Sequence, residues 1–269
     1  DGSGAGAYDS EITGLDANTT YYARAYAVNA AGTAYGNEVT FKTEALTVTD
    51  IDGNEYAAVK IGTQVWMAEN LATTKLNDGT KLTTDNEIPL VTSAAAWAAL
   101  TTPGYCWYDN DKEGTESSGP LYNWHAVSTG KLCPVGWHVP SASEWIDLIH
   151  YLILNGYNYD GSTSTPTSEN KLAKATAYPE GWKTSSNTGA PGNDDYPDKV
   201  NATGFSARPA GYRRHDGTFL DRGDWAYWWS SSSASDEYAH YYNIFYNTES
   251  IYYNYWLKNN GYSVRCIKD

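Results

Sequence analysis

Three acidic side chains within one short stretch have the spacing of oxygen ligands for a cation. Asp109, Asp111 and Glu113 alternate with other polar residues and are followed by Gly114. Carboxylate oxygens at this spacing open many calcium-binding loops. An EF-hand loop ends in a bidentate glutamate at its twelfth position, and Pro120 stands there instead. The stretch therefore indicates either a bound cation, with calcium as the one candidate cofactor, or a solvated acidic turn.

Patterns that carry catalysis are missing from the sequence. The five histidines do not form H-x-x-x-H or H-E-x-x-H, and there is no G-x-S-x-G elbow and no glycine-rich nucleotide loop. His138 follows Trp137 in an extended stretch, where a structural role is the simpler interpretation. The 32 acidic residues contain no spacing that singles out a pair for glycoside hydrolysis. No residue is predicted to be catalytic.

Aromatic residues with a polar group are the most abundant candidates for ligand contacts. The chain has 24 Tyr and 11 Trp but only 4 Phe, and such rings suit stacking on sugars or peptides, or else fill a loop-rich core. If residues 227–232 form a strand, Trp228 or Trp229 must point inward. The predicted ligand-binding residues are Trp182, Trp225, Trp228, Tyr241, Tyr253 and Trp256.

Net charge excludes two classes of partner. The formal charge is −14, whereas nucleic acids and anionic membrane surfaces require basic patches. No apolar run of about 18 residues is present, so we expect no direct membrane insertion. The sequence starts at Asp1 without a signal peptide, and we expect a mature or trimmed form whose targeting sequence lies outside it.

The residues that must position these groups centre on one corner. Residues 137–139 predict a short strand that Pro140 ends. Ser141 and Glu144 have the spacing of a capping box, and apolar residues then recur every three or four positions up to Asn155. The pattern predicts a helix over residues 142–154. Shorter strands are predicted on either side, with the last at 262–267 lying centrally in a sheet.

The first 45 residues differ from the rest. The run G-L-x-x-x-T-x-Y-Y-x-R-A-Y-A-x-N-x-x-G resembles the second half of a fibronectin type III domain, strands E, F and G, with Leu15 and Tyr21 in its tyrosine-corner pattern. About 90–100 residues make a whole domain, so this resemblance implies a partial β-sandwich over 1–45. We expect it to pack on the following domain or on another molecule that supplies the missing sheet.

Four motifs resemble one family over roughly residues 46–269. They are I-G-T-Q-V-W-M-A-E-N-L at 61–71, C-P-V-G-W-H-V-P-S-A-S-E-W at 133–145, G-F-S-A-R-P-A-G-Y-R at 204–213 and S-V-R-C at 263–266. The order and spacing are similar to those of the Fibrobacter succinogenes major paralogous domain family. The resemblance implies an α+β, C-type-lectin-like fold with long loops and few short helices, related to sulfatase-modifying domains.

The same resemblance bears on which cysteines form a disulfide. One disulfide and one thiol is the simplest arrangement of three cysteines in an exported chain. C-type-lectin-like folds often join the helix region to the last strand, which makes Cys133–Cys266 one candidate. Cys106–Cys133 is the other candidate pair. Three buried free thiols are the remaining alternative. The formylglycine-generating relatives use two reactive cysteines near the chain end, and only Cys266 is present there. That difference argues against oxidase chemistry.

The resemblance also points to the long loops. Residues 156–203 hold several oxygen-bearing side chains in the region where lectins of this class bind calcium and sugar, although E-P-N, Q-P-D and W-N-D are absent. A variable surface or another kind of binding surface is the alternative. The side chains are Asn187, Asn193, Asp194, Asp195 and Asp198.

These expectations converge on recognition. We expect an exported protein at the cell surface or outer membrane, where it could be attached as a lipoprotein. We expect it to be a non-enzymatic binding or adhesion module that recognises a glycan or protein ligand through its loops and exposed aromatic residues. One alternative is a structural or assembly module of a surface fibre. The other is an enzyme on a formylglycine-generating-like fold, which would require a deep pocket with converging polar groups.

Overall fold

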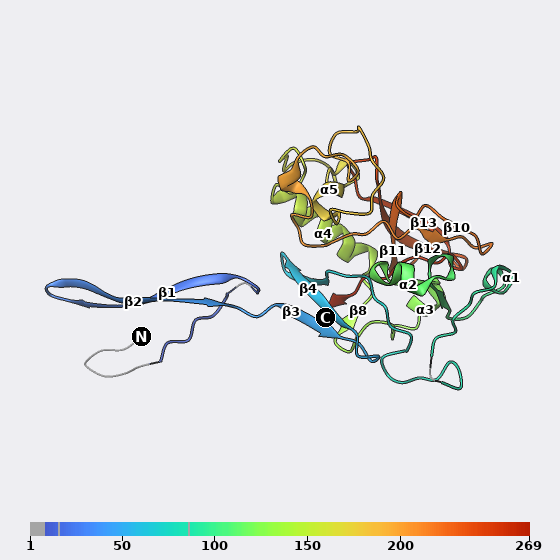
Figure 1. The fold of residues 1–269 in the computed structure, drawn as a ribbon, viewed down its shortest axis with the longest axis horizontal. Helices are drawn as coiled ribbons and strands as arrows, with labels where there is room; N and C mark the ends of the chain where they lie inside the picture. Colours follow the sequence, from blue (N-terminus) through green and yellow to red (C-terminus); the bar gives the residue numbers. More distant parts are fainter. Residues whose placement is uncertain (1–8, 16, 86) are drawn as a thin grey trace. The chain divides into compact units, whose positions relative to one another are not determined.

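The computed structural model describes residues 9–15, 17–85 and 87–269 (Figure 1). The chain divides into two compact units, Asp1–Leu46 and Thr47–Asp269. Most of the second unit is strand and irregular chain with a few short helices, so its class is mixed α+β, as predicted. Each unit is described by itself.

The first unit contains one antiparallel hairpin. β1 (Thr20–Asn29) pairs with β2 (Gly32–Lys42), with a bulge after Arg24. Three strands and a partial sandwich were expected here, and the described residues form only this two-stranded sheet. The segment before β1 turns instead of extending, because Gly14 and Asn18 both take positive φ.

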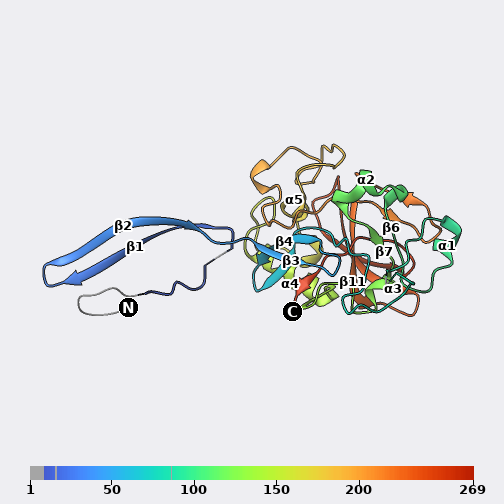
Figure 2. The same cartoon turned by 60° about the horizontal axis from the view of Figure 1, so that its bottom comes forward.

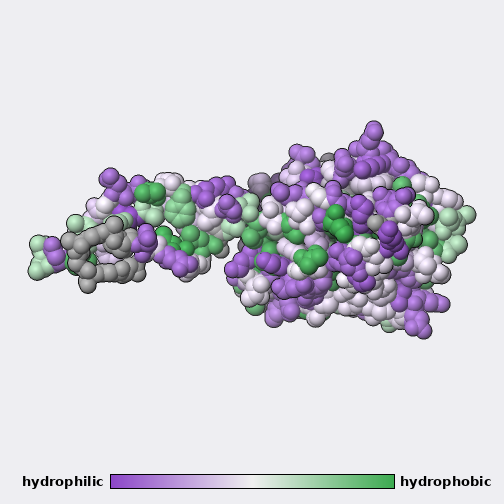
Figure 3. Space-filling model, turned by 90° about the horizontal axis from the view of Figure 1, so that it is seen from below, coloured by the Kyte–Doolittle hydropathy of each residue, from purple (hydrophilic) through white to green (hydrophobic). Residues whose placement is uncertain are grey.

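The hairpin exposes large side chains. Strand residues alternate between the two faces of a sheet, and a second layer normally covers one of them. Figure 3 shows hydrophobic surface along this unit. The following strand residues are more than half exposed: Tyr22, Tyr26, Val28, Tyr35 and Val39.

A five-stranded sheet in the second unit joins segments from distant parts of the sequence. Its order is β3 (Leu46–Thr49), β4 (Glu55–Ile61), β5 (Gln64–Met67), β14 (Ile267–Lys268) and β8 (Trp137–His138). β14 is antiparallel to both β5 and β8. The strand before the Pro140 corner and the end of the S-V-R-C segment are therefore neighbours in one sheet.

The predicted helix is present as α4 (Ala142–Leu154). The Ser141 side chain accepts the amide of Glu144, and the Glu144 carboxylate accepts the amide of Ser141, so both halves of the capping box are formed. Its apolar face packs against β4 and β11, and Figures 1 and 2 both show the helix beside β4. The buried residues of this face are Trp145, Leu148, Ile149, Leu152 and Ile153.

A three-stranded sheet runs between two hydrophobic clusters. It consists of β11 (Trp225–Ser233), β12 (Tyr238–Phe245) and β13 (Tyr252–Leu257), in that order and antiparallel. Along β11, Tyr227 and Trp229 enter one cluster, while Ala226 and Trp228 enter the cluster beneath α4. Alternating side chains are thus buried on both faces, which explains the nearly continuous aromatic run.

Short elements complete the unit. The helices are α1 (Ala94–Ala98), α2 (Lys112–Thr115), α3 (Trp124–Val127) and α5 (Ala173–Thr176), and the 3₁₀ turns are η1 (Tyr108–Asn110), η2 (Glu116–Ser118), η3 (Thr167–Glu169) and η4 (Pro197–Lys199). The remaining strands are β6 (Tyr105–Cys106), β7 (Leu121–Tyr122), β9 (Tyr212–Arg213) and β10 (Phe219–Leu220).

The last strand is shorter than predicted. A continuous strand was expected over 262–267, but β14 has two residues. The preceding residues make single bridges to different partners, Tyr262 to Tyr122 and Ser263 to Trp228. This segment therefore links separate sheets, and one register cannot satisfy all of its partners.

Arg265 organises that segment from within. Its guanidinium donates to the Met67 carbonyl at 3.0 Å, to Asn70 Oδ1 at 2.8 Å and to the Phe205 carbonyl. Complete burial lowers the pKa of Arg265 to about 9, because burial disfavours the charged form. The arginine joins the 61–71, 204–213 and 263–266 segments at one point.

Candidate functional site

Four exposed aromatic side chains of the second unit lie on one strand. Among the described strands β13 pairs with β12 alone, so it is an edge of its sheet. Its rings extend beyond both hydrophobic clusters and face solvent. Their exposed fractions are 39% for Tyr252, 49% for Tyr253, 53% for Tyr255 and 47% for Trp256. We refer to these four residues as the aromatic edge.

A shallow pocket is part of this edge. Its volume is about 470 Å³, and it is lined by Tyr238, Asn254, Tyr255, Trp256 and Leu257. Aromatic faces supply apolar contact area, while a tyrosine hydroxyl or an asparagine amide supplies hydrogen bonds. This combination suits the apolar faces and hydroxyl groups of a sugar, or an extended peptide.

Neighbouring rings hold Tyr253 in place. Its ring stacks on His240 with 4.9 Å between centroids, and its hydroxyl lies 3.3 Å from His240 Nε2. Tyr242, which packs beneath α4, is 5.2 Å away. Burial lowers the pKa of His240, so the imidazole is neutral at pH 7 and adds no charge. The site's outer rings are therefore supported by rings that continue into the core.

Two of the six predicted ligand residues lie on the aromatic edge, and two are buried. Tyr253 and Trp256 are on the edge, whereas Trp228 is 1% exposed and Tyr241 is 8% exposed. The Trp228 indole donates to Asn70 Oδ1 at 2.9 Å. The prediction for Trp228 and Tyr241 is corrected on this point, because both faces of their sheet are covered and neither ring can reach a ligand.

The other two predicted aromatics are half-buried. Trp182 packs on the cluster beneath α4 and donates from its indole to the Tyr178 carbonyl at 3.0 Å. Trp225 stacks on Tyr227 with centroids 5.2 Å apart. Neither is part of the pocket on the aromatic edge. The sequence does not clearly separate Trp182 and Trp225 from Tyr253 and Trp256, since all six predicted ligand residues lie in aromatic, strand-like or loop segments.

The predicted calcium ligands do not gather into a site. The Asp111 carboxylate accepts the Gly114 amide at 3.0 Å and caps α2, and Asp109 takes a positive φ in the turn before it. In the portion of the chain that the structure describes, no group of three or more His, Cys, Asp or Glu side chains is arranged to hold a metal ion. For Asp109, Asp111 and Glu113 the acidic-turn interpretation fits this geometry.

A lysine ammonium occupies the centre of the long acidic loop. Lys174 Nζ donates to the carbonyls of Asn193 at 2.5 Å and Asp195 at 2.6 Å, and Asp195 Oδ1 lies 2.8 Å away. The other Asp195 oxygen accepts the Gly189 amide at 2.8 Å. Of the side chains considered for calcium, Asp195 thus pairs with a cation supplied by α5, while Asn187 Nδ2 donates to the Asn247 carbonyl at 2.7 Å.

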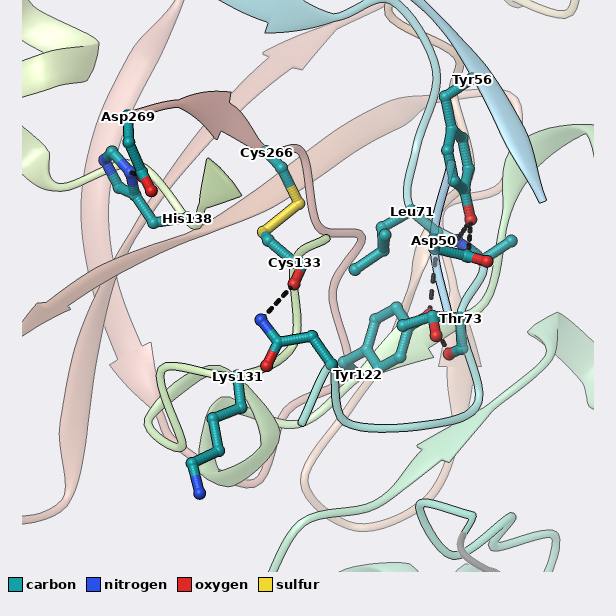
Figure 4. Close-up of a disulfide and its surroundings, with 12 residues drawn as sticks. Asp50, Tyr56, Leu71, Thr73, Tyr122, Lys131, Cys133, His138, Cys266 and Asp269 are labelled. Carbon is teal, nitrogen blue, oxygen red and sulfur yellow. Dashed lines mark hydrogen bonds and ion pairs between the residues drawn. A yellow bond between two sulfur atoms is a disulfide. The ribbon is translucent and has the colours of Figure 1, made fainter. Parts of the chain in front are cut away.

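The structure joins Cys133 to Cys266 by a disulfide and leaves Cys106 as a buried thiol (Figure 4). Burial raises the pKa of Cys106 to about 12 despite the nearby Arg213 guanidinium. The thiolate needed for a nucleophile or redox centre is therefore disfavoured. The disulfide ties the segment before the Pro140 corner to the last strand.

A chain of polar side chains links the helix start to β14 without forming a catalytic triad. His138 Nδ1 lies 2.6 Å from Asp269 Oδ1, and Nε2 lies 2.8 Å from Glu144 Oε1 (Figure 4 shows the Asp269 contact). The Ser141 hydroxyl donates to Glu144 at 2.7 Å. Both imidazole nitrogens face carboxylates, so neither is free to take a proton from a serine, as a general base must.

A second, larger pocket was not predicted. It measures about 630 Å³ and brings together the 52–56 turn, the E-N pair of the 61–71 motif, residues 87–92, β6 and the η1–η2 region. Asp52 on its wall accepts hydrogen bonds from Thr74 and pairs with Lys75 at 2.6 Å. Its lining comes from segments more than 60 residues apart, and no single motif indicates such a convergence.

These features define a class: a mixed α+β, disulfide-linked domain with a covered aromatic sheet and an exposed aromatic edge. The family model described as the Fibrobacter succinogenes major domain matches residues 59–268, and the chain belongs to that family. No curated protein and no solved structure matches the sequence. Among the described residues, no helix is long and apolar enough to cross a membrane.

Proposed function

We propose that the chain is a non-enzymatic binding or adhesion module that recognises a glycan or a protein. The observation that carries the proposal is the aromatic edge, where four large rings are each at least 39% exposed on one edge strand. Exposed apolar surface of this kind marks interaction sites more often than isolated exposed residues do. A C-type-lectin-like arrangement of the core remains the finer fold proposal.

The pKa shifts of the larger pocket support binding over catalysis. Burial opposes ionisation of Asp52, but hydrogen bonds from Lys75 and Thr74 outweigh it and lower its pKa. Burial and the carboxylates of Glu87 and Asp52 raise the pKa of Tyr105 to about 12. Each shift strengthens the protonation state that the group already has at neutral pH, whereas a general acid or base needs a pKa near the working pH.

The first test compares glycan binding by the unaltered chain and by the Tyr253→Ala and Trp256→Ala variants. Tyr253 and Trp256 point to opposite faces of β13, so we expect a glycan-array ligand to lose up to about tenfold in affinity in one of the two variants, since one stacked ring contributes about 0.5–1.5 kcal/mol. Tyr22→Ala, which removes a ring of the first unit that is even more exposed, is the control and should keep full affinity. Unchanged binding in all three variants would remove the aromatic edge from the proposal.

We also propose an exported location, at the cell surface or outer membrane, with lipid attachment as one means of anchoring. The Cys133–Cys266 disulfide supports export, because disulfides persist in oxidising compartments and are rare in the cytosol. Cell fractionation with surface biotinylation tests the location. Recovery of the protein in the cytosol with reduced cysteines would contradict it.

A structural or assembly role is the second candidate, and the exposed hairpin side chains favour it. A two-stranded hairpin is at best marginally stable alone in water, and β1–β2 exposes Val28, Tyr35 and Val39. A neighbouring molecule that covered this hairpin would bury them. Light scattering after size exclusion is the test: association that Val39→Lys abolishes favours assembly, and a monomer at all concentrations rejects it.

A further inference from the structure

The larger pocket combines acidic groups with buried aromatic rings. Its volume is about 630 Å³, within the range of small-molecule sites. Five acidic residues and one lysine line it, which gives a formal charge of −5 + 1 = −4. The acidic residues are Asp52, Glu55, Glu69, Glu87 and Glu116.

Only some of these carboxylates are used by the fold. Asp52 is bonded to Lys75 and to Thr74, and the Glu69 carboxylate accepts the Ala57 amide at 3.0 Å. Within the described part of the chain, the carboxylates of Glu55, Glu87 and Glu116 make no hydrogen bond or ion pair. These three carboxylates have no bonded partner, although Lys75, which is paired with Asp52, is close enough to Glu87 to interact with its charge.

The Tyr105 hydroxyl is an independent indication of a ligand. Tyr105 is 4% exposed and lines the pocket, yet its hydroxyl makes no hydrogen bond to any described residue. Glu87 and Asp52, both in the pocket wall, act on its pKa together with burial, so the hydroxyl lies near them. The Tyr105 hydroxyl is not among the side-chain atoms that are both buried and unpaired, so it keeps contact with the solvent of the pocket, where a ligand atom can bond to it.

The aromatic wall already accepts a cation. Trp107 lines the pocket, and Lys112 Nζ lies 5.6 Å from its ring centroid. A cation at this distance from an indole face is attracted by the ring quadrupole. Leu90, also on the wall and half exposed, adds apolar surface. The pocket thus offers charge at its rim and aromatic and aliphatic contacts below.

We propose that this pocket binds an organic cation, a guanidinium or alkylammonium group carried on a small apolar or hydroxylated body. The carboxylates of Glu55, Glu87 and Glu116 neutralise the cation, Trp107 packs against it, and the Tyr105 hydroxyl bonds to the ligand. A basic peptide side chain and an amino sugar share this chemistry. The site is separate from the aromatic edge and does not depend on the function proposed for it.

Calorimetric titration of the full chain with two matched ligand pairs tests the proposal. N-acetyl-arginine amide is compared with the neutral N-acetyl-citrulline amide, and glucosamine with N-acetylglucosamine. We expect the charged member of at least one pair to bind about tenfold more tightly and to weaken in high salt. The arginine pair assigns the pocket to basic side chains, and the glucosamine pair to amino sugars. Equal binding within both pairs, or no binding, overturns the proposal.

Variants locate the binding. Glu87→Gln combined with Glu116→Gln should weaken the charged ligand about tenfold, and Lys112→Ala should strengthen it about threefold by removing a competing charge. Glu180→Gln, an exposed acid outside the pocket, is the control and should have no effect. Equal losses in the control and the pocket variants would mean non-specific attraction and reject the site.

Tyr105→Phe separates ligand binding from folding. The hydroxyl has no partner among the described residues, so its removal should leave the melting temperature unchanged or raised while weakening the ligand about fivefold, the value of one hydrogen bond. A lower melting temperature with unaltered affinity contradicts the assignment. Calcium that competes with the arginine ligand at equal concentration would also overturn it, because the pocket would then select charge alone.

Discussion

His138 gives the protein a residue-scale pH dependence. Burial opposes its charged form, but the hydrogen bonds to Asp269 and Glu144 outweigh burial and raise its pKa above the ordinary value of 6.5. A raised folded-state pKa adds stability below about pH 6.5, and that stability is lost as pH rises through the folded value. Replacing His138 with Gln should therefore lower the melting temperature at pH 6 and have little effect at pH 9.

The expected size is modest. The imidazole is 40% exposed, so solvent screens the pairs, and about 0.5–1 kcal/mol is a reasonable difference between pH 6 and pH 9. Differential scanning calorimetry across that range measures it. His215→Gln is the comparison, since no ion pair to that residue is present among the described residues. A His138 variant with a pH-independent loss would contradict the interpretation.

At the scale of elements, Lys174 fixes the long loop to α5. Lys174→Met keeps the side chain's length but leaves the Asn193 and Asp195 oxygens without their cation, and the lysine side chain is 1% exposed. Loss of one partner of a fully buried pair costs about 3–5 kcal/mol, and the cost here should be smaller because the Asp195 side chain is 25% exposed. We expect a lower free energy of unfolding and faster hydrogen exchange over residues 187–199.

The chain provides a matched control three residues earlier. Lys171 pairs with Asp160 at 2.5 Å, with both side chains 28–30% exposed. Partly exposed pairs contribute about 0–1 kcal/mol, so Lys171→Met should have a small effect and leave exchange in the 187–199 loop unchanged. Equal losses of unfolding free energy in the two variants would show that the burial of Lys174 against the loop adds no stability.

The disulfide connects two elements that are 133 residues apart in the sequence. Removing a crosslink that closes a long loop typically costs about 2–5 kcal/mol. We expect dithiothreitol to lower the melting temperature of the unaltered chain and of Cys106→Ala, but not of a Cys133→Ala/Cys266→Ala variant, which should already melt at the lower temperature. A reductant effect that persists in the double variant would contradict this pairing.

Local patterns predicted elements better than they predicted sites. Ser141 and Glu144 are three residues apart, so their capping box and the following helix were visible in the sequence and are present in α4. Trp228 and Tyr253 look alike in the sequence, yet one is buried between two clusters and the other lies on an edge. That difference depends on which sheet neighbour is present, and local spacing contains no such information.

The same limit applies to the acidic residues. Asp109 and Asp111 have a ligand-like spacing, but backbone hydrogen bonds use the Asp111 carboxylate. The pocket that contains Tyr105 and Glu87 is made by chain segments that meet only in the folded state. Short-range spacing indicated a metal site, and long-range packing produced a different acidic site elsewhere.

For the whole molecule, the second unit should fold independently. Every residue of the two large hydrophobic clusters lies between Val48 and Ile267. A protein of residues 47–269 should therefore melt within about 2 °C of the full chain, since a 1 kcal/mol change moves a domain of this size by about 2–4 °C. Calorimetry of both forms tests this, and loss of the cooperative transition on removing residues 1–46 would contradict it.

The position of β14 has a consequence for biosynthesis. This strand lies between β5 and β8, and Cys266 and Arg265 precede it directly. Residues 265–268 must therefore leave the ribosome before β5 and β8 can pair with β14. Until then the nascent polypeptide lacks the buried Arg265 guanidinium, the disulfide of Cys266 and the interior strand β14. The domain therefore cannot complete its fold until residues 265–268 have left the ribosome.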